Sequence, residues 1–238
     1  MKDVIRIYPS PEMSASACAA FIDRQIGEVL QEKEFVTMAL SGGSTPALLF
    51  SALVGEYSNT GYWNKVKFFW VDERCVAPSD PESNYGNAKN HFLDPLNIPE
   101  ENIFRIQGEN KPEEEVKRYT GVLEAQLGPE LQLDICLLGM GADGHTASIF
   151  PPAIKLMESK EIVAVATHPD SGQRRITITG KLINKSKTTI FLAFGKEKKS
   201  VVEQILNNKG REKYPAGLVS NSFSGVVWYL DTEAYRLP

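Results

Sequence analysis

The chain has 238 residues, of which 42% are hydrophobic and 24% are charged, and its formal net charge is −4. This composition is typical of a water-soluble globular protein, and the length fits one large domain or two small ones. Nucleic acid and anionic membranes usually bind a concentrated basic surface, so the balanced charge argues against either as the main partner. A small anionic ligand needs only a few donors and remains compatible with this charge.

The cysteines and the start of the chain narrow the class of protein further. Cys18, Cys75 and Cys136 are far apart and form no Cys-x-x-Cys pair, so neither a disulfide framework nor a zinc knuckle is expected. The chain starts without the apolar stretch of a signal peptide, and no segment approaches the roughly 20 apolar residues of a membrane span. We therefore expect a cytoplasmic protein. Its three histidines are widely spaced, which predicts no metal site.

The spacing of apolar residues predicts the elements in chain order. After a strand-like N-terminus come a helix over 12–32, a strand over 36–40, a helix over 46–53, a strand over 66–71 and helices over 86–96 and 112–127. Strands follow over 133–138, 162–167, 176–179 and 188–194, then a helix over 196–207 and a strand over 226–230. Thr45 is the expected N-cap of the second helix, with Pro46 at its first position. Strands separated by helices predict an α/β fold with a mostly parallel sheet, in which ligands bind beyond the carboxyl ends of the strands.

The first unusual strand end is Ser41-Gly42-Gly43-Ser44-Thr45-Pro46, between a strand and a helix. Its glycines let backbone amides approach an anion, and the helix behind presents free N–H groups and the positive end of its dipole. The segment is not a Walker A loop, because it lacks the lysine and the spacing. An ordinary Gly-rich turn with a Ser/Thr cap is the alternative, and local sequence does not separate the two.

The second unusual strand end is Asp72-Glu73-Arg74, directly after an aromatic strand that ends at Val71. Three consecutive charges are costly to bury, so they are either solvated, which is the commoner case, or part of a site. The turn-rich segment 78–85, which contains Asn84, is expected to fold over the cleft.

The third unusual strand end is the segment 139–148, which contains Asp143-Gly144-His145. Its glycines match the dinucleotide fingerprint G-x-G-x-x-G, but the proline pair at 151–152 stops any long helix. We therefore reject a dinucleotide-binding oxidoreductase. Glycines around a lone histidine leave its ring accessible, and a nearby carboxylate fixes its tautomer.

The remaining candidates are isolated residues with weaker local signals. Arg175 precedes a strand-like run, and Lys198 lies at the start of a charged helix, so both are candidates for an anion site. Taken alone, each is most often a solvated surface charge. A lone histidine is more often structural than catalytic, and that interpretation fits His91 and His168 better than His145.

Together and in this order, the three segments resemble the 6-phosphogluconolactonase family. The third segment is the most specific, and the resemblance continues through Arg175-Ile176-Thr177, Gly195-Lys196-Glu197-Lys198 and Trp228-Tyr229-Leu230-Asp231. It implies that residues 1–238 form a single domain, a Rossmann-like three-layer sandwich with helices on both faces of the sheet. It also implies hydrolysis of 6-phospho-D-glucono-1,5-lactone to 6-phospho-D-gluconate in the oxidative pentose phosphate pathway, without a cofactor, by a monomer or weak homo-oligomer.

The resemblance also implies roles for individual residues. His145 would do the proton transfers, with Asp72, Arg74 and Asp143 around it, and either carboxylate would orient the imidazole. An N–H of the Gly-rich turn or Arg74 would stabilise the oxyanion. The residues expected to bind the substrate and its phosphate are Ser41, Gly42, Gly43, Ser44, Thr45, Asn84, Arg175 and Lys198.

Two alternatives from other functional classes remain. Glucosamine-6-phosphate deaminases are similar in fold, but they place a glutamate five residues after the histidine, where this chain has Phe150. They also continue the second strand end with tyrosine, where this chain has Arg74. A non-catalytic sugar-phosphate sensor usually carries a fused helix-turn-helix and loses the catalytic residues, whereas this chain has no room for the former and keeps His145.

Overall fold

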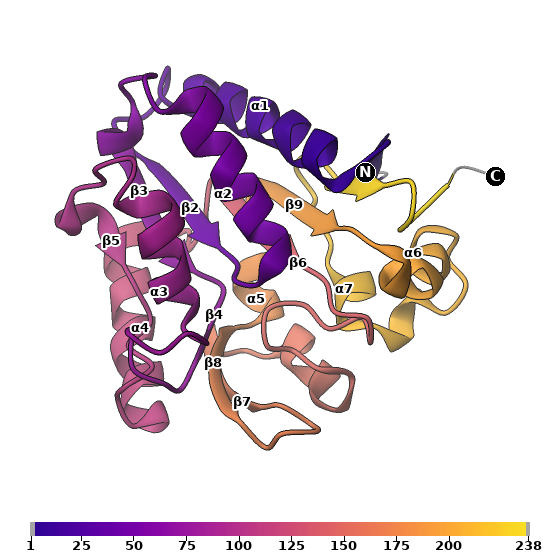
Figure 1. Ribbon diagram of the computed structural model, residues 1–238. Coiled ribbons are helices and arrows are strands. Elements are labelled where there is room, and N and C mark those ends of the chain that lie inside the picture. Colours follow the sequence, from indigo (N-terminus) through magenta and orange to yellow (C-terminus); the bar gives the residue numbers. More distant parts are fainter. Residues whose placement is uncertain (1–2, 237–238) are drawn as a thin grey trace.

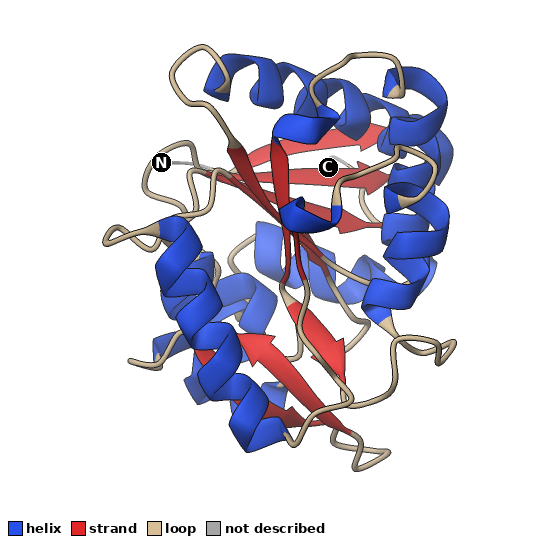
Figure 2. Ribbon diagram, turned by 90° about the vertical axis from the view of Figure 1, so that its left-hand side faces the viewer, coloured by secondary structure: helices blue, strands red, loops and turns tan. Residues whose placement is uncertain are grey.

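The computed structural model describes residues 3–236 as two sheets surrounded by helices (Figures 1 and 2). In the larger, seven-stranded sheet every pair of neighbouring strands is parallel. In spatial order its strands are β1 (Val4–Tyr8), β10 (Val226–Asp231), β9 (Thr188–Ala193), β6 (Ile135–Gly139), β2 (Val36–Leu40), β3 (Val66–Trp70) and β5 (Ile103–Phe104). This confirms the predicted α/β fold with a mostly parallel sheet.

Helices cover both faces of this sheet (Figure 2). Helices α1 (Pro11–Val29) and α2 (Ser44–Tyr57) pack against each other on one face, and α4 (Pro112–Leu127) lies on the other. The remaining α-helices are α3 (Asn84–Ala88), which continues as a π-helix over Lys89–Leu93, α5 (Gly180–Ile183), α6 (Lys199–Leu206) and α7 (Pro215–Leu218). Short 3-10 turns span Trp63–Lys65, Glu100–Asn102, Pro151–Glu158, Lys196–Lys198 and Arg211–Lys213. None of the helices in the described range is long and apolar enough to cross a membrane.

β2 and β6 are parallel neighbours, but the strands that follow them are added on opposite sides of the sheet, and this determines where a ligand can bind. From β2 the chain continues through α2 to β3 on one side, whereas from β6 it continues to β9 on the other. In open α/β sheets such a change of side leaves a crevice beyond the carboxyl ends of the two strands. The loops that begin at Ser41 and Met140 therefore lie on either side of this crevice.

Helix α2 begins two residues before the predicted start at Pro46. Its N-cap is Gly43 rather than Thr45, and no side chain caps its first turn. Gly43 has a φ of 102°, which residues with a Cβ rarely adopt, so this glycine turns the chain from strand to helix. Similarly, α1 ends at Val29 rather than at residue 32.

A second, three-stranded sheet lies beyond the carboxyl end of β3, at the bottom of Figure 1. It consists of β4 (Asp72–Arg74), β8 (Arg174–Ile178) and β7 (Val163–Thr167), and both pairings are antiparallel. The sequence predicted strands near β7 and β8 but not a separate sheet, because an apolar run does not reveal its partner. The six-residue connection between β7 and β8 is too short for a parallel crossover, so these strands form a hairpin.

An aromatic cluster supports the helical segment that carries Asn84. Phe92 is fully buried, and its ring centroid lies 5.0 Å from that of Phe50 and 5.4 Å from those of Trp63 and Phe68. The ring joins the π-helical continuation of α3 to α2 and β3. The position of Asn84 therefore depends on core packing.

Replacing Phe92 with alanine should lower the free energy of unfolding by about 3–5 kcal/mol, the usual effect of removing a buried ring. Urea denaturation followed by circular dichroism measures the change. Phe223→Ala is the matched control, because Phe223 is 52% exposed, and it should change the free energy by less than about 0.5 kcal/mol. Equal effects of the two substitutions would show that the cluster does not support the fold.

Candidate active site

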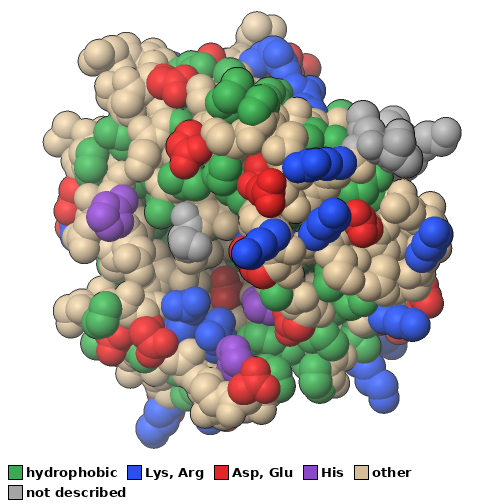
Figure 3. Space-filling view, turned by 45° about the vertical axis from the view of Figure 1, so that its right-hand side comes forward, with side chains coloured by type: hydrophobic (Ala, Val, Ile, Leu, Met, Phe, Trp, Pro, Cys, Tyr) green, Lys and Arg blue, Asp and Glu red, His purple; other side chains and the backbone are tan. Residues whose placement is uncertain are grey.

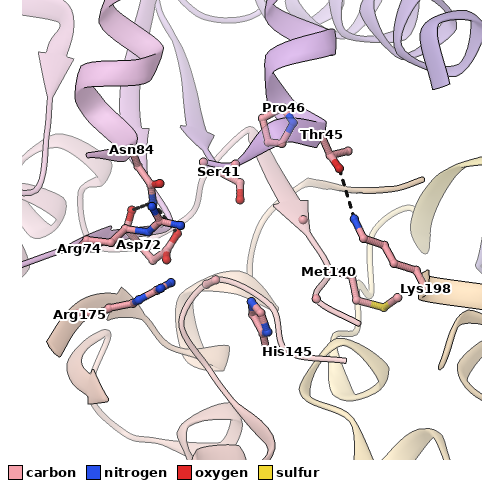
Figure 4. Close-up of a pocket in the computed structure, with 15 residues that line it drawn as sticks. Ser41, Thr45, Pro46, Asp72, Arg74, Asn84, Met140, His145, Arg175 and Lys198 are labelled. Atoms are coloured by element: carbon pink, nitrogen blue, oxygen red, sulfur yellow. Dashed lines mark hydrogen bonds between the residues drawn. The ribbon is translucent and has the colours of Figure 1, made fainter. Parts of the chain in front are cut away.

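A cavity of about 180 Å³ opens at the carboxyl ends of β2 and β6. Figure 3 shows a hollow on this side of the molecule, with basic and histidine side chains around it. Figure 4 shows the labelled side chains that reach the cavity from several elements. They come from the turn before α2, from β4 and the start of α3, from the loop after β6, from β8 and from the turn before α6.

The turn between β2 and α2 presents bare backbone to the cavity. A Cβ on Gly42 would lie 1.8 Å from Oδ1 of Asn84, so only glycine fits there without a shift. Among the described groups, none accepts a hydrogen bond from the N–H of Gly42 or Gly43, and no side chain caps α2. Free N–H groups at a helix start and the positive end of the helix dipole attract anions. The turn therefore has the features of an anion-binding loop.

Asp72 is a buried carboxylate on the cavity wall, with 4% of its surface exposed. The side-chain amide of Asn84 donates to its Oδ1 at 3.2 Å, and the hydroxyl of Ser148 donates to its Oδ2 at 2.6 Å. These donors replace the water that the carboxylate loses on burial. Each oxygen still has a lone pair with which it can accept a hydrogen bond from a ligand.

Glu73 does not line the cavity but holds the start of α3 in place. Its carboxylate accepts hydrogen bonds from the N–H groups of Asn84 and Tyr85 at 2.8 Å and from the Ser83 hydroxyl at 3.0 Å. Burial raises the pKa of Glu73, and these backbone hydrogen bonds oppose the rise. The charged strand end is thus largely buried rather than solvated, and Glu73 holds Asn84 in position.

Arg74 and Arg175 lie side by side because they are directly paired residues of β4 and β8. Arg74 donates from Nη1 to the carbonyl of Glu82 at 2.6 Å, and Arg175 donates from Nε to the side-chain oxygen of Gln173 at 3.2 Å. Both acceptors are neutral. Burial lowers the pKa of Arg175, and the neighbouring charge of Arg74 lowers it further. A bound anion would relieve the repulsion between these two cations.

Lys198 reaches the cavity from the other side of His145 (Figure 4). Its Nζ donates to the hydroxyl of Thr45 at 3.3 Å, which joins the turn before α6 to the start of α2. Burial lowers the pKa of Lys198, because the charged form loses water. An anion at the start of α2 would stabilise the charged form. Cationic groups therefore flank the histidine on both sides.

His145 projects into the cavity between these cations (Figure 4). Its Nδ1 lies 2.6 Å from Oδ1 of Asp143, and its backbone N–H donates to the same oxygen at 3.1 Å. Burial alone would raise the pKa of Asp143, but the hydrogen bonds and charge of His145 outweigh it, so this pKa is lowered. An ionised carboxylate only accepts hydrogen bonds, so Nδ1 carries a hydrogen, and in the neutral form of the imidazole the lone pair is on Nε2. The structure pairs the imidazole with Asp143 and not with Asp72.

Close packing restricts the orientation of the imidazole. A Cβ on Gly141 would lie 2.2 Å from Nδ1 of His145, so the ring lies directly against the backbone at this glycine. The ring centroid of Phe150 lies 4.7 Å from that of His145, and Phe150 is buried. The guanidinium carbon of Arg175 lies 5.6 Å from the centroid of the same phenyl ring. Phe150 therefore contacts both the histidine and one of the cations.

The structure brings most of the sequence-predicted site residues to this one cavity. Those that line it are Ser41, Gly42, Gly43, Thr45, Asp72, Arg74, Asn84, His145, Arg175 and Lys198. Asp143 contacts His145 without lining the cavity, and the side chain of Ser44 lies outside what the structure describes. Glu73 and Ser148 lie inside two of the sequence motifs, but no role was predicted for either. Within residues 3–236, no group of three or more His, Cys, Asp or Glu side chains is arranged to hold a metal ion.

Comparison with known proteins places this geometry in a family. A family model described as glucosamine-6-phosphate isomerases/6-phosphogluconolactonase matches residues 9–228. The 6-phosphogluconolactonase of Haemophilus influenzae is 42% identical over 204 residues, which cover 85% of this chain and 87% of that protein. The 6-phosphogluconolactonase of Treponema pallidum is 41% identical over 197 residues, which cover 82% of each chain. A crystal structure of the devB protein has a TM-score of 0.88 and 39% identity, and the match covers 98% of both chains.

The large sheet is open and parallel. Where its strand order changes sides, a turn with the features of an anion-binding loop lies beside a histidine that is hydrogen-bonded to a carboxylate. This architecture is suited to phosphorylated small molecules. The chain belongs to the family of glucosamine-6-phosphate isomerases and 6-phosphogluconolactonases. Its relatives at 41–42% identity are lactonases of that family. The resemblance inferred from the three motifs is therefore confirmed.

Proposed function

We propose that this protein hydrolyses 6-phospho-D-glucono-1,5-lactone to 6-phospho-D-gluconate, the second step of the oxidative pentose phosphate pathway. The observation that carries the proposal is the His145–Asp143 pair, 2.6 Å apart, beside an anion-binding turn and between cationic side chains. The 6-phosphogluconolactonases that share 41–42% identity with this chain support the same substrate.

In the proposed mechanism, neutral His145 acts as a general base. Its Nε2 takes a proton from water as the water attacks C1 of the lactone, and the imidazolium returns the proton to the ring oxygen as the C1–O bond breaks. The hydrogen bond to Asp143 keeps the imidazole oriented and stabilises its charged form. A lactone is an activated ester, so the reaction needs no covalent nucleophile and no cofactor.

The other cavity groups bind and polarise the substrate. The turn before α2, together with Arg175 and Lys198, binds the phosphate, and Asp72 accepts a hydrogen bond from a sugar hydroxyl. Arg74 or an N–H of the turn stabilises the oxyanion that forms at C1. Because the phosphate is several bonds from C1, its binding energy positions the reacting carbon without taking part in the chemistry.

The purified protein should open the phosphorylated lactone faster than the spontaneous reaction, and His145→Ala should lower kcat by about 10²–10⁴. A pH-stat assay corrected for spontaneous opening measures both rates. His91→Ala is the matched control, because His91 does not line the cavity, and it should leave kcat unchanged. Near wild-type turnover in the His145 variant would remove this residue from the mechanism. Ammonia release from glucosamine 6-phosphate, in place of lactone hydrolysis, would favour a deaminase.

Gly141→Ala should lower kcat by about tenfold to a hundredfold, because the new methyl group would displace the imidazole from its working position. The same assay measures the rate, and circular dichroism checks the fold. The control is Gly27→Ala in α1, where a Cβ would meet nothing within 4 Å. If both variants turn over like the wild type, the imidazole does not need the orientation that Gly141 permits.

Arg175→Ala should lower kcat/KM for the phosphorylated lactone by about tenfold to a hundredfold, mainly through KM, because a hydrogen bond to a charged group is lost. Unphosphorylated D-glucono-1,5-lactone provides the control substrate. With it, the variant and the wild type should have the same kcat/KM, since no phosphate is present. Equal losses on both substrates would show that Arg175 does not bind the phosphate.

The proposal extends to the state of the protein in the cell. We propose a cytoplasmic protein whose partner is a small molecule rather than nucleic acid or a membrane, and which is a monomer or a weak homo-oligomer. The free thiols of Cys18, Cys75 and Cys136 support a reducing compartment. We also propose that residues 1–238 act as one domain, because the first and last strands, β1 and β10, pair within one sheet.

A further inference from the structure

Ser148 stands in the loop that carries His145, yet it does not line the cavity. Its side chain is fully buried, and its hydroxyl donates to Oδ2 of Asp72 at 2.6 Å. This distance is in the range of charge-assisted hydrogen bonds between a hydroxyl and a carboxylate. Ser148 therefore contacts the buried carboxylate of the cavity from behind, where a ligand does not reach.

The backbone directs Ser148 toward Asp72. Residues 146–149 form a tight turn that is closed by a hydrogen bond of 2.9 Å from the Ile149 N–H to the Thr146 carbonyl. Ala147, inside this turn, has a φ of 49°, in the left-handed region that residues other than glycine seldom adopt. The turn allows His145 to project into the cavity while Ser148, three residues later, projects toward β4.

Strand β8 holds the same turn. The N–H of Ser148 donates to the hydroxyl of Thr177 at 3.2 Å, and Thr177 is the residue of β8 that pairs directly with Asp72. Ser148 is thus bound to Asp72 through its hydroxyl and to the cross-strand neighbour of Asp72 through its backbone. These two bonds attach the histidine loop to the small sheet.

We propose that Ser148 is a positioning residue, whose hydroxyl sets the orientation of the Asp72 carboxylate and couples it to the loop of His145. This inference rests on the proposed function, in which Asp72 contacts the sugar. Without the hydroxyl, Oδ2 loses its donor, while Asn84 still holds Oδ1. The carboxylate is then free to rotate toward the guanidinium group of Arg74 and away from the substrate.

A double-mutant cycle on lactone hydrolysis tests the proposal. Ser148→Ala should lower kcat/KM by about tenfold to a hundredfold, the effect of losing a hydrogen bond to a charged group. In an Asp72→Ala background the same substitution should change kcat/KM by less than about twofold, because its acceptor is gone. An equal loss in both backgrounds, or a loss below about twofold in the wild type, would overturn the proposal.

Two further variants separate positioning from packing. Ser148→Cys fills the same position with a somewhat larger thiol that is only a weak donor, so it should lose as much activity as Ser148→Ala, and it carries the test if the alanine variant does not fold. Full activity of the cysteine variant would mean that Ser148 only fills space. Ser14→Ala removes another buried hydroxyl, one without a hydrogen-bond partner among the described residues, and should leave kcat/KM unchanged. A loss as large as that of Ser148→Ala would overturn the proposal.

The wild-type protein distinguishes this inference from the proposed function. If the wild type does not hydrolyse the lactone, the proposed function fails, and this inference fails with it. If the wild type hydrolyses the lactone and Ser148→Ala retains its kcat/KM, only the role of Ser148 is rejected.

Discussion

The chain leaves the large sheet for the small one at Val71, and the arrangement of the site depends on this step. The N–H of Val71 donates to the Leu40 carbonyl of the large sheet at 2.9 Å, and its carbonyl accepts from the Ile178 N–H of the small sheet at 2.8 Å. The next two residues, Asp72 and Glu73, are therefore buried at the junction, and their carboxylates need protein donors. Those donors come from the start of α3 and from the loop after β6. Satisfying two buried charges thus draws the elements of the site together.

The cationic side chains of the cavity have no charged hydrogen-bond partner among the described residues. Two buried carboxylates elsewhere have cationic partners: Asp134 lies 2.6 Å from Nζ of Lys33, and Glu115 accepts from Nε of Arg118 at 2.6 Å. At the cavity, by contrast, Arg175 and Lys198 bond to neutral acceptors, and burial lowers the pKa of each. Cations held partly away from water and bonded only to neutral acceptors carry an unfavourable desolvation cost. In the proposed function the phosphate of the substrate offsets this cost when it binds, and its binding energy then serves to place the substrate.

Local signals predicted much of the fold, and contacts between distant segments explain what they missed. The strand at 36–40 and the helix at 112–127 match their predicted bounds, because a buried strand is a continuous apolar run and Pro112 is suited to a helix start. The small sheet was missed because β4 pairs with β8, about 100 residues later in the chain. The three site motifs were visible as glycines and charges at strand ends. That Ser148 and Asn84 both contact Asp72 was not, since neither spacing nor composition encodes which strand ends meet.

Phe150 provides a physical reason why this cavity suits the proposed lactone hydrolysis better than the isomerisation for which the family is also named. Its ring is 1% exposed and lies 4.7 Å from the ring of His145 and 4.9 Å from that of His168, measured between centroids. A carboxylate in its place would have to replace this apolar packing with a charge-bearing group beside the histidine. Isomerising an aminosugar requires protons to move between neighbouring carbons as well as to the ring oxygen, so it needs more than one acid–base group. In the proposed mechanism, opening the lactone moves one proton from water to the ring oxygen, and a single imidazole held by Asp143 suffices for that transfer.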